Sequence, residues 1–383
     1  MRRSLPLVLT FVLLAGACSD DSASTAAPGT TAPGATAPAA TTDVRPSGAP
    51  ADTDASAPTA GSDGVTFPGA SWDSVDPTAV GLSTSGVDAL AALGAASGSG
   101  CIAVVRDGRL AVEWYADDWD AATDLENFSA TKSVSATLVG IAQDLGYLDI
   151  EQPASDFLTE WQGTDSEAVT IRNLISNDSG RFWDFETDYQ KMVFSPDRSA
   201  FAIGLEQQHE PGTHWEYNNS AIQTLEQVLQ RATGEEVADF AEEHLFGPLG
   251  MTVHYKLDPS GNTRRSWASR PGASTWPASG GSPATRDDGA TGRSCPPTTW
   301  PRRPASQELN DGYGFLWWVN EHDAWPGIPT DAYAALGLGD QITLVIPSLD
   351  MVVVRVGPTA GTADYEGSFL VDLGTTAIAA LDG

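Results

Sequence analysis

Two hairpin patterns, at opposite ends of the globular part, constrain the fold more than any other feature of the chain. Gly100–Arg106 and Leu110–Tyr115 are β-prone runs joined through Asp-Gly, a pair that is typical of a tight hairpin turn. Gln341–Pro347 and Met351–Val356 repeat the arrangement around a short Ser-Leu-Asp connection. Because strands need partners, this placement predicts one antiparallel sheet that brings the two ends of the globular part together.

The segments between the hairpins are mostly typical of helices. Ala221–Ala232 and Val237–Leu245 are examples, and a last helix is predicted over Tyr365–Leu381. We therefore expect an α+β fold, with an antiparallel sheet of about five strands, flanking helices and an inserted helical lobe. The folded domain is expected to cover residues 71–383, enough chain for a substantial core.

Residues 1–70 differ from the rest of the chain. Met-Arg-Arg is followed by an apolar run, Leu5–Leu14, and by small residues before Cys18. This pattern resembles a bacterial lipoprotein signal over residues 1–18, in which Cys18 is acylated, and ordinary secretion is the alternative. Residues 19–70 are rich in Ala, Pro and Thr and predict a disordered tether. The protein is expected at the outer face of the bacterial cytoplasmic membrane, and we expect it to contact that membrane through its lipid anchor only.

Composition excludes several classes of partner. The net charge of -31 at pH 7 repels nucleic acid, so no nucleic-acid partner is expected. The five histidines are scattered and no metal-binding spacing is present, so we expect no metal and no cofactor. Besides Cys18, Cys101 and Cys295 are too few for a disulfide framework. None of these features bears on the oligomeric state.

A serine and a lysine stand one helical turn apart at the start of a predicted helix. After Phe128-Ser129-Ala130-Thr131-Lys132, apolar residues recur at the spacing of one helix face, so Ser129 lies at or near a helix N-terminus. A serine hydroxyl needs a base to become nucleophilic, and a lysine serves when burial lowers its pKa. The free N–H groups of the helix end favour negative charge on a substrate oxygen. A chance Ser-x-x-Lys is the alternative, but only one of the three lysines has a serine three residues before it.

The second candidate element is Tyr217-Asn218-Asn219. In an extended segment, residues two apart point the same way, so Tyr217 and Asn219 can both face Ser129. A phenolic oxygen can relay a proton between nucleophile and leaving group, and an Asn amide can fix Lys132 and the substrate carbonyl. Taken alone, Tyr-x-Asn is equally compatible with a turn that packs an aromatic ring.

With these residues in this order, the chain resembles the serine β-lactamase-related and penicillin-binding-protein-like hydrolases. That family includes class C β-lactamases, D-alanyl-D-alanine carboxypeptidases, esterases and 6-aminohexanoate-dimer hydrolases, and Ser-x-x-Lys is its first motif. Three further stretches are similar to segments of that family, namely Thr170–Gly180, Pro248–Met251 and Tyr313–Trp317. The resemblance implies a β-lactamase/transpeptidase-like fold and acyl transfer, with Ser129 as nucleophile and with Lys132 and Tyr217 taking its proton.

The family's third motif, Lys-Thr-Gly or His-x-Gly on the strand that edges the site, has no cationic counterpart here. The matching stretch is Ala335–Gln341, which contains no Lys or His. The resemblance implies that Gly337 allows close approach of the backbone and that a second oxyanion N–H lies near Leu338. Since the missing cation normally supports a substrate carboxylate, a neutral ester or amide is expected to fit better than a β-lactam.

Residues 264–305 contain no Leu, Ile, Val, Phe, Met or Tyr and are rich in arginine. Such a composition is foreign to a folded lobe. A disordered insertion is one interpretation. A wrong reading frame bounded by two compensating shifts is the other, because Arg, Pro, Ser, Gly and Thr are what GC-rich codons give out of frame. On the second interpretation Cys295 is not a designed residue, and the encoded chain loses core contacts.

The sequence therefore predicts a serine hydrolase that acts on a small-molecule carboxylic ester or amide through a covalent acyl-enzyme. A catalytically silent ligand-binding lipoprotein on the same fold is the alternative from another class. An assembly module on the cell surface is a third interpretation, for which no partner is indicated.

Overall fold

The computed structural model describes residues 73–121, 123, 125–249, 251, 253–269, 304, 307–358 and 368–381. All of them belong to one compact unit, Asp54–Gly383. The expected lipoprotein signal, with Cys18, and the expected tether over residues 19–70 lie outside the described residues. Within the part of the chain that is described, no helix is both long enough and apolar enough to cross a membrane.

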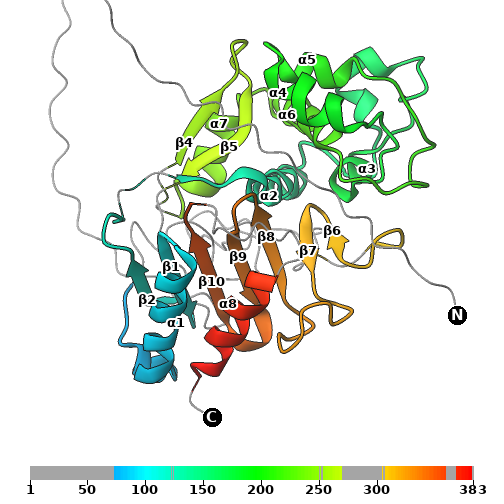
Figure 1. Ribbon diagram of the computed structural model, residues 1–383. Helices are drawn as coiled ribbons and strands as arrows, with labels where there is room; N and C mark the ends of the chain where they lie inside the picture. The colour runs from blue at the N-terminus through cyan, green and yellow to red at the C-terminus, as the bar shows by residue number, and fades with distance from the viewer. Residues whose placement is uncertain are drawn as a thin grey trace, which may run out of the picture. The chain divides into compact units, whose positions relative to one another are not determined.

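The centre of this unit is an antiparallel sheet of seven strands in the order β2-β1-β10-β9-β8-β7-β6 (Figure 1). Its strands are β1 (Cys101–Arg106), β2 (Arg109–Tyr115), β6 (Tyr313–Gly314), β7 (Trp317–Val319), β8 (Tyr333–Gly337), β9 (Gln341–Ile346) and β10 (Met351–Val356). Both predicted hairpins are confirmed, as β1–β2 and β9–β10. Because β1 also pairs with β10, with Cys101 opposite Val356, the two ends of the globular part meet in one sheet.

The sheet has seven strands rather than the expected five or so. Strands β6 and β7 contain only two and three residues, too few for the alternation that marks a strand in a sequence. They extend the sheet beyond β8, where Trp318 pairs with Ala334. The remainder of the expectation, an α+β fold with an antiparallel sheet, is confirmed.

Helices α1 (Thr84–Ser97) and α8 (Ser368–Ala379) cover one face of this sheet (Figure 1). Leu90 of α1 and Leu373 of α8 are completely buried in the same apolar cluster as Ile102 of β1. The predicted last helix is confirmed over Ser368–Ala379, whereas residues 380 and 381 lie beyond its end.

The helical lobe is inserted between β2 and β6. Its α-helices are α2 (Thr131–Asp144), α3 (Ile171–Ser176), α4 (Met192–Phe194), α5 (Arg198–Ile203), α6 (Asn219–Thr233) and α7 (Val237–Ala241). The helix predicted over Ala221–Ala232 lies inside α6. The helix predicted over Val237–Leu245 is α7 followed by a π-helical turn, Glu242–Phe246.

A small second sheet in the lobe has the strand order β3-β5-β4. Its strands are β3 (Leu125–Glu126), β4 (Val253–Leu257) and β5 (Thr263–Ser269). The first residues of the arginine-rich stretch 264–305, namely 264–269, thus belong to a strand. Most of the remaining stretch, up to residue 305, lies outside the described residues, so both interpretations of it stay predictions.

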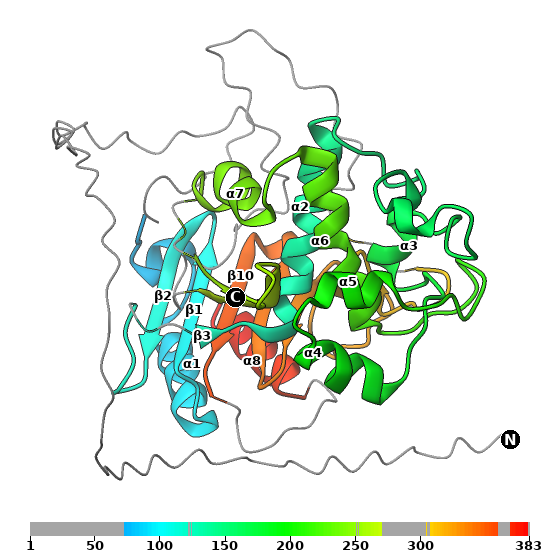
Figure 2. The ribbon, with the colours of Figure 1, turned by 90° about the horizontal axis from the view of Figure 1, so that it is seen from above.

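Helix α2 is the buried centre of the lobe and sets the position of the candidate site. Leu138 and Ile141, on its predicted apolar face, are buried in one cluster with Leu225 of α6 and Ala335 of β8. Figure 2 shows α2 between α6 and the strands of the main sheet. Since α2 packs on both neighbours, its N-terminal end is fixed relative to the end of β8.

Candidate active site

Ser129 lies in a short 3-10 turn, η2 (Phe128–Ala130), that runs directly into α2. Phe128 has a φ of 46°, in the left-handed region that bulky residues seldom adopt. Two hydrogen bonds hold this strained turn: Thr131 Oγ1 donates to the Phe128 carbonyl at 2.6 Å, and the Ala130 N–H donates to the Asn127 carbonyl at 3.1 Å. The predicted placement of Ser129 at a helix N-terminus is confirmed.

Lys132 meets Ser129 across the first turn of α2. Its Nζ donates a hydrogen bond to Ser129 Oγ at 2.6 Å, and its side chain is only 2% exposed. The same Nζ lies 4.8 Å from the centroid of the Tyr217 ring. The structure therefore brings together Ser129, Lys132 and Tyr217, and a base at this distance from a hydroxyl can exchange a proton with it.

An aromatic cluster holds the Tyr217 ring in place. The ring stacks on Trp318 at 6.2 Å between centroids and meets Tyr313 edge-on at 6.1 Å. Tyr313 and Trp318 in turn contact each other at 4.9 Å. Both partners stand on the short strands β6 and β7, so the two strands that were not expected support one wall of the site.

Asn219 is the first residue of α6, and Asn218 caps that helix by accepting from the Ala221 N–H at 2.8 Å. Tyr217 and Asn218 precede the helix, whereas Asn219 belongs to it, so the expected extended segment does not include Asn219. The Asn219 Nδ2 donates to Asp188 Oδ2 at 2.7 Å, and Asn219 is only 8% exposed. Sequence reasoning missed Asp188, which lies in another segment of the lobe.

Gly337, the last residue of β8, lies directly against the turn that carries Ser129. A Cβ added to Gly337 would overlap the Asn127 carbonyl oxygen and lie 3.2 Å from the Ala130 nitrogen. The expected close approach of the backbone at Gly337 is therefore present. Leu338, the next residue, is about half exposed.

Two residues that sequence reasoning missed, Arg355 and Gln341, support the turn after Leu338 through hydrogen bonds. Arg355 of β10 is fully buried, and its Nη1 donates to the Gly339 carbonyl at 2.6 Å and to the Asp340 carbonyl at 3.1 Å. Gln341 Nε2 donates to the Gly339 carbonyl at 3.1 Å. Burial lowers the pKa of Arg355 to about 10, although the Asp340 charge opposes this. A single arginine within the apolar run of β10 was the available signal.

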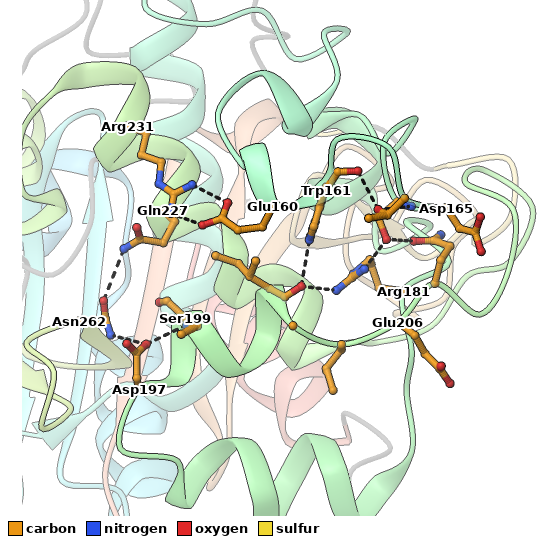
Figure 3. A pocket seen from close by; sticks show the side chains of 17 residues that line it. Glu160, Trp161, Asp165, Arg181, Asp197, Ser199, Glu206, Gln227, Arg231 and Asn262 are labelled. Atoms are coloured by element: carbon orange, nitrogen blue, oxygen red, sulfur yellow. Dashed lines mark hydrogen bonds and ion pairs between the residues drawn. The ribbon is translucent and has the colours of Figure 1, made fainter.

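A pocket of about 580 Å³ lies elsewhere in the lobe, around Arg181 (Figure 3). The buried Arg181 guanidinium donates to the Ala202 and Ile203 carbonyls and lies 4.4 Å from the Trp161 ring centroid. Arg231 forms a bidentate pair with Glu160 beside it. None of the predicted site residues lines this pocket. We place the candidate active site at Ser129 instead, because Ser129, Lys132 and Tyr217 come together there. Among the described residues, no cluster of His, Cys, Asp and Glu side chains is arranged to hold a metal ion.

The Beta-lactamase family model matches residues 86–367, well over half of the chain. PbpX, a putative penicillin-binding protein of Bacillus subtilis (strain 168), is 26% identical over 163 residues. This match covers 40% of each of the two proteins, so the chain spans less than half the length of that relative.

Solved structures give the same assignment at the level of the fold. A putative 6-aminohexanoate-dimer hydrolase from Bacillus anthracis superposes with a TM-score of 0.56 at 16% identity, over 74% of this chain and 79% of that one. A family VIII carboxylesterase gives 0.55 at 15% identity, over 78% and 97%. At these identities the likeness shows the fold alone, while the family follows from the sequence match. The chain is thus a member of the Beta-lactamase family, with the fold of its penicillin-binding-protein-like and hydrolase branches.

Proposed function

We propose that the protein is a serine hydrolase that cleaves a neutral carboxylic ester or amide through a covalent acyl-enzyme on Ser129. The observation that carries this proposal is the 2.6 Å separation between Lys132 Nζ and Ser129 Oγ at the N-terminal end of α2. Burial favours the neutral form of an amine, which is the form that accepts a proton. The Tyr217 ring beside Nζ is suited to passing that proton on.

In this mechanism, the Ser129 proton moves to Lys132 or Tyr217 while Oγ attacks the substrate carbonyl. Backbone N–H groups at Ser129 and near Leu338 stabilise the oxyanion, and Asn219 orients the substrate carbonyl. The C–O or C–N bond then breaks, and the leaving group takes the proton. Water attacks the acyl-enzyme by the reverse sequence of proton transfers and releases the acid.

The substrate class follows from the charges beside the site. The edge formed by β8 and its turn carries no cation, and Arg355, the cation behind that turn, is fully buried with its donors bound to three carbonyl groups and the Ser99 hydroxyl. Among the residues that the structure describes at this edge, a substrate carboxylate would therefore find no cationic partner. A neutral acyl compound avoids this cost, and one structural relative is a carboxylesterase by name.

A panel of substrates tests the proposal on purified full-length protein. We expect turnover of p-nitrophenyl esters or of a p-nitroanilide, and much slower turnover of the β-lactam nitrocefin. Ser129→Ala and Lys132→Ala should each lower kcat/KM by roughly 10³-fold. A well-folded protein that turns over none of these compounds would overturn the proposal and favour a silent ligand-binding protein. Near-normal turnover in either variant would also overturn it.

We further propose that Cys18 is acylated and anchors the protein to the outer face of the cytoplasmic membrane. The support is the order of a basic start, a short apolar run and small residues before Cys18. Cells grown with tritiated palmitate should label the wild-type protein and leave Cys18→Ala unlabelled. An unlabelled wild-type protein released into the medium would instead establish ordinary secretion.

A further inference from the structure

We propose that Asp188 is a positioning residue for the candidate active site, acting through Asn219. This inference rests on the proposed function, because Asn219 belongs to the Tyr-x-Asn element of that site. Asp188 lies in a π-helical turn, Thr187–Lys191, and is 1% exposed. It comes 31 positions before Asn219 in the chain.

Both oxygens of the Asp188 carboxylate accept hydrogen bonds from the first two residues of α6. Oδ2 accepts from the backbone N–H and from Nδ2 of Asn219, at 3.0 and 2.7 Å. Oδ1 accepts from the backbone N–H and from Oγ of Ser220, at 2.6 and 2.8 Å. A carboxylate offers about four acceptor positions, so all of them are taken by two consecutive residues.

This arrangement fixes both the direction of the Asn219 amide and the place where α6 begins. With Nδ2 bound to Asp188, the Asn219 Oδ1 must point away from the carboxylate. The backbone at Asn219 is held by the same carboxylate, and Tyr217 stands only two residues before it. The Tyr217 ring in turn covers Lys132 Nζ, so loss of the carboxylate disturbs the residues around the nucleophile.

Asp188 is assigned a positioning role and no direct chemical one. Its acceptor positions are occupied by groups of the protein, and it is buried, so neither substrate nor the Ser129 proton reaches it. The N–H groups at the N-terminal end of α6, a 15-residue helix, favour a negative charge on Asp188. The Asp188 carboxylate therefore holds the first two residues of α6 in position.

Asp258 provides a matched control in the same lobe. It is 5% exposed and accepts hydrogen bonds from four donor atoms, the Arg198, Ser260 and Asn262 N–H groups and Asn262 Nδ2, each at 3.0 Å. These bonds join α5 to the segment after β4 and involve no residue of the candidate site. Loss of its charge should therefore cost stability alone.

The test compares Asp188→Asn with Asp258→Asn in the full-length protein, using kcat and KM for a p-nitrophenyl ester and the melting temperature. Both variants should lower the melting temperature. Only Asp188→Asn should lower kcat, by about 10- to 100-fold as for a misplaced catalytic group, with KM changed by less than threefold. A kcat within twofold of wild type in Asp188→Asn would overturn the inference.

A double-mutant comparison shows whether the effect passes through Asn219. In an Asn219→Ala background, Asp188→Asn should lower kcat by less than twofold further, because the Nδ2 contact through which the effect is proposed to pass is already lost, whereas the bonds to the Asn219 N–H and to Ser220 affect stability only. A full additional loss of kcat would overturn the proposed route. Should Asp188→Asn fail to fold, Asp188→Glu keeps the charge but displaces Asn219 by one methylene, and should still lower kcat at least fivefold. Wild-type kcat in that variant would contradict the inference.

A readout without turnover separates this inference from the proposed function. The side-chain amide of Asn219, identified in a ¹H–¹⁵N spectrum by its loss in Asn219→Ala, should shift and exchange faster with water in Asp188→Asn. An unchanged amide signal would overturn the positioning role even if the enzyme is active. Absence of wild-type turnover overturns the proposed function alone, since the amide signal still reports whether Asp188 orients Asn219.

Discussion

Substitution of Gly337 by alanine tests the contact between β8 and the turn that carries Ser129. The added methyl group would overlap the Asn127 carbonyl oxygen and would lie 3.1 Å from Gln341 Cβ. Real Cβ atoms essentially never approach another atom within 3.0 Å, so the strand and the turn must separate. Both obstacles at the turn, Asn127 and Ala130, are backbone atoms that cannot rotate away.

The size of the effect follows from this geometry. Relief of the overlap requires a separation of about 1 Å, and a misplacement of about 1 Å in an active site costs about 100-fold in rate. We therefore expect Gly337→Ala to lower kcat/KM for a p-nitrophenyl ester by about 100-fold, equivalent to about 2.7 kcal/mol. Most of the loss should be in kcat, because the change acts on the side of Ser129 where we propose that the oxyanion is bound.

Gly204→Ala is the matched control for this substitution. A methyl group at Gly204 would meet its nearest neighbour, the Ala200 carbonyl oxygen, at an ordinary 3.4 Å. Gly204 is the C-cap of α5 and lines the pocket around Arg181, which none of the predicted site residues lines. That variant should keep wild-type kcat/KM. If Gly337→Ala kept kcat/KM within threefold of wild type while remaining folded, the close packing of β8 on the Ser129 turn would be refuted.

Three further predictions concern other parts of the molecule. Arg355→Met should lower the free energy of unfolding in urea by about 3 kcal/mol, because the Gly339 and Asp340 carbonyls lose their buried donor; an unchanged value would contradict the bracing role. Burial acts to raise the pKa of Asp258, but its hydrogen bonds outweigh this and hold the pKa below its ordinary value. The Asp258 charge therefore stabilises the fold above the unfolded-state pKa and stops doing so as pH falls through the folded-state pKa, so the stability difference between wild type and Asp258→Asn should shrink from pH 7 to pH 3, and a constant difference would be the contrary result. Finally, the nucleotide sequence of codons 264–305 should encode an apolar-periodic segment in another frame, and if it does not, the insertion interpretation stands.

The parts of the fold that were predicted from the sequence depend on neighbours along the chain. Asp-Gly between two β-prone runs is sufficient to predict the β1–β2 hairpin, because the turn conformation is local. Ser129 and Lys132 are three residues apart, so the continuous turn from η2 into α2 is enough to bring them together. Their hydrogen bond is compatible with that spacing.

The parts that were not predicted depend on packing between distant segments. The contact between Asp188 and Asn219 joins segments 31 positions apart, and no periodicity in either one marks it. The strands β6 and β7 are too short to show a pattern, yet they supply the rings around Tyr217. Arg355 was visible as a charge in an apolar strand, but only the tertiary fold shows which carbonyl groups it binds.

The most direct test of the central claim is to locate the covalent adduct formed by a fluorophosphonate probe. After reaction of the folded protein, peptide mass spectrometry should find one adduct, on Ser129, and none in Ser129→Ala. Lys132→Ala should react far more slowly, because the base that lies 2.6 Å from Ser129 Oγ is absent. An adduct on another residue with Ser129 unmodified, or no adduct on folded wild-type protein, would contradict the assignment of Ser129 as the nucleophile.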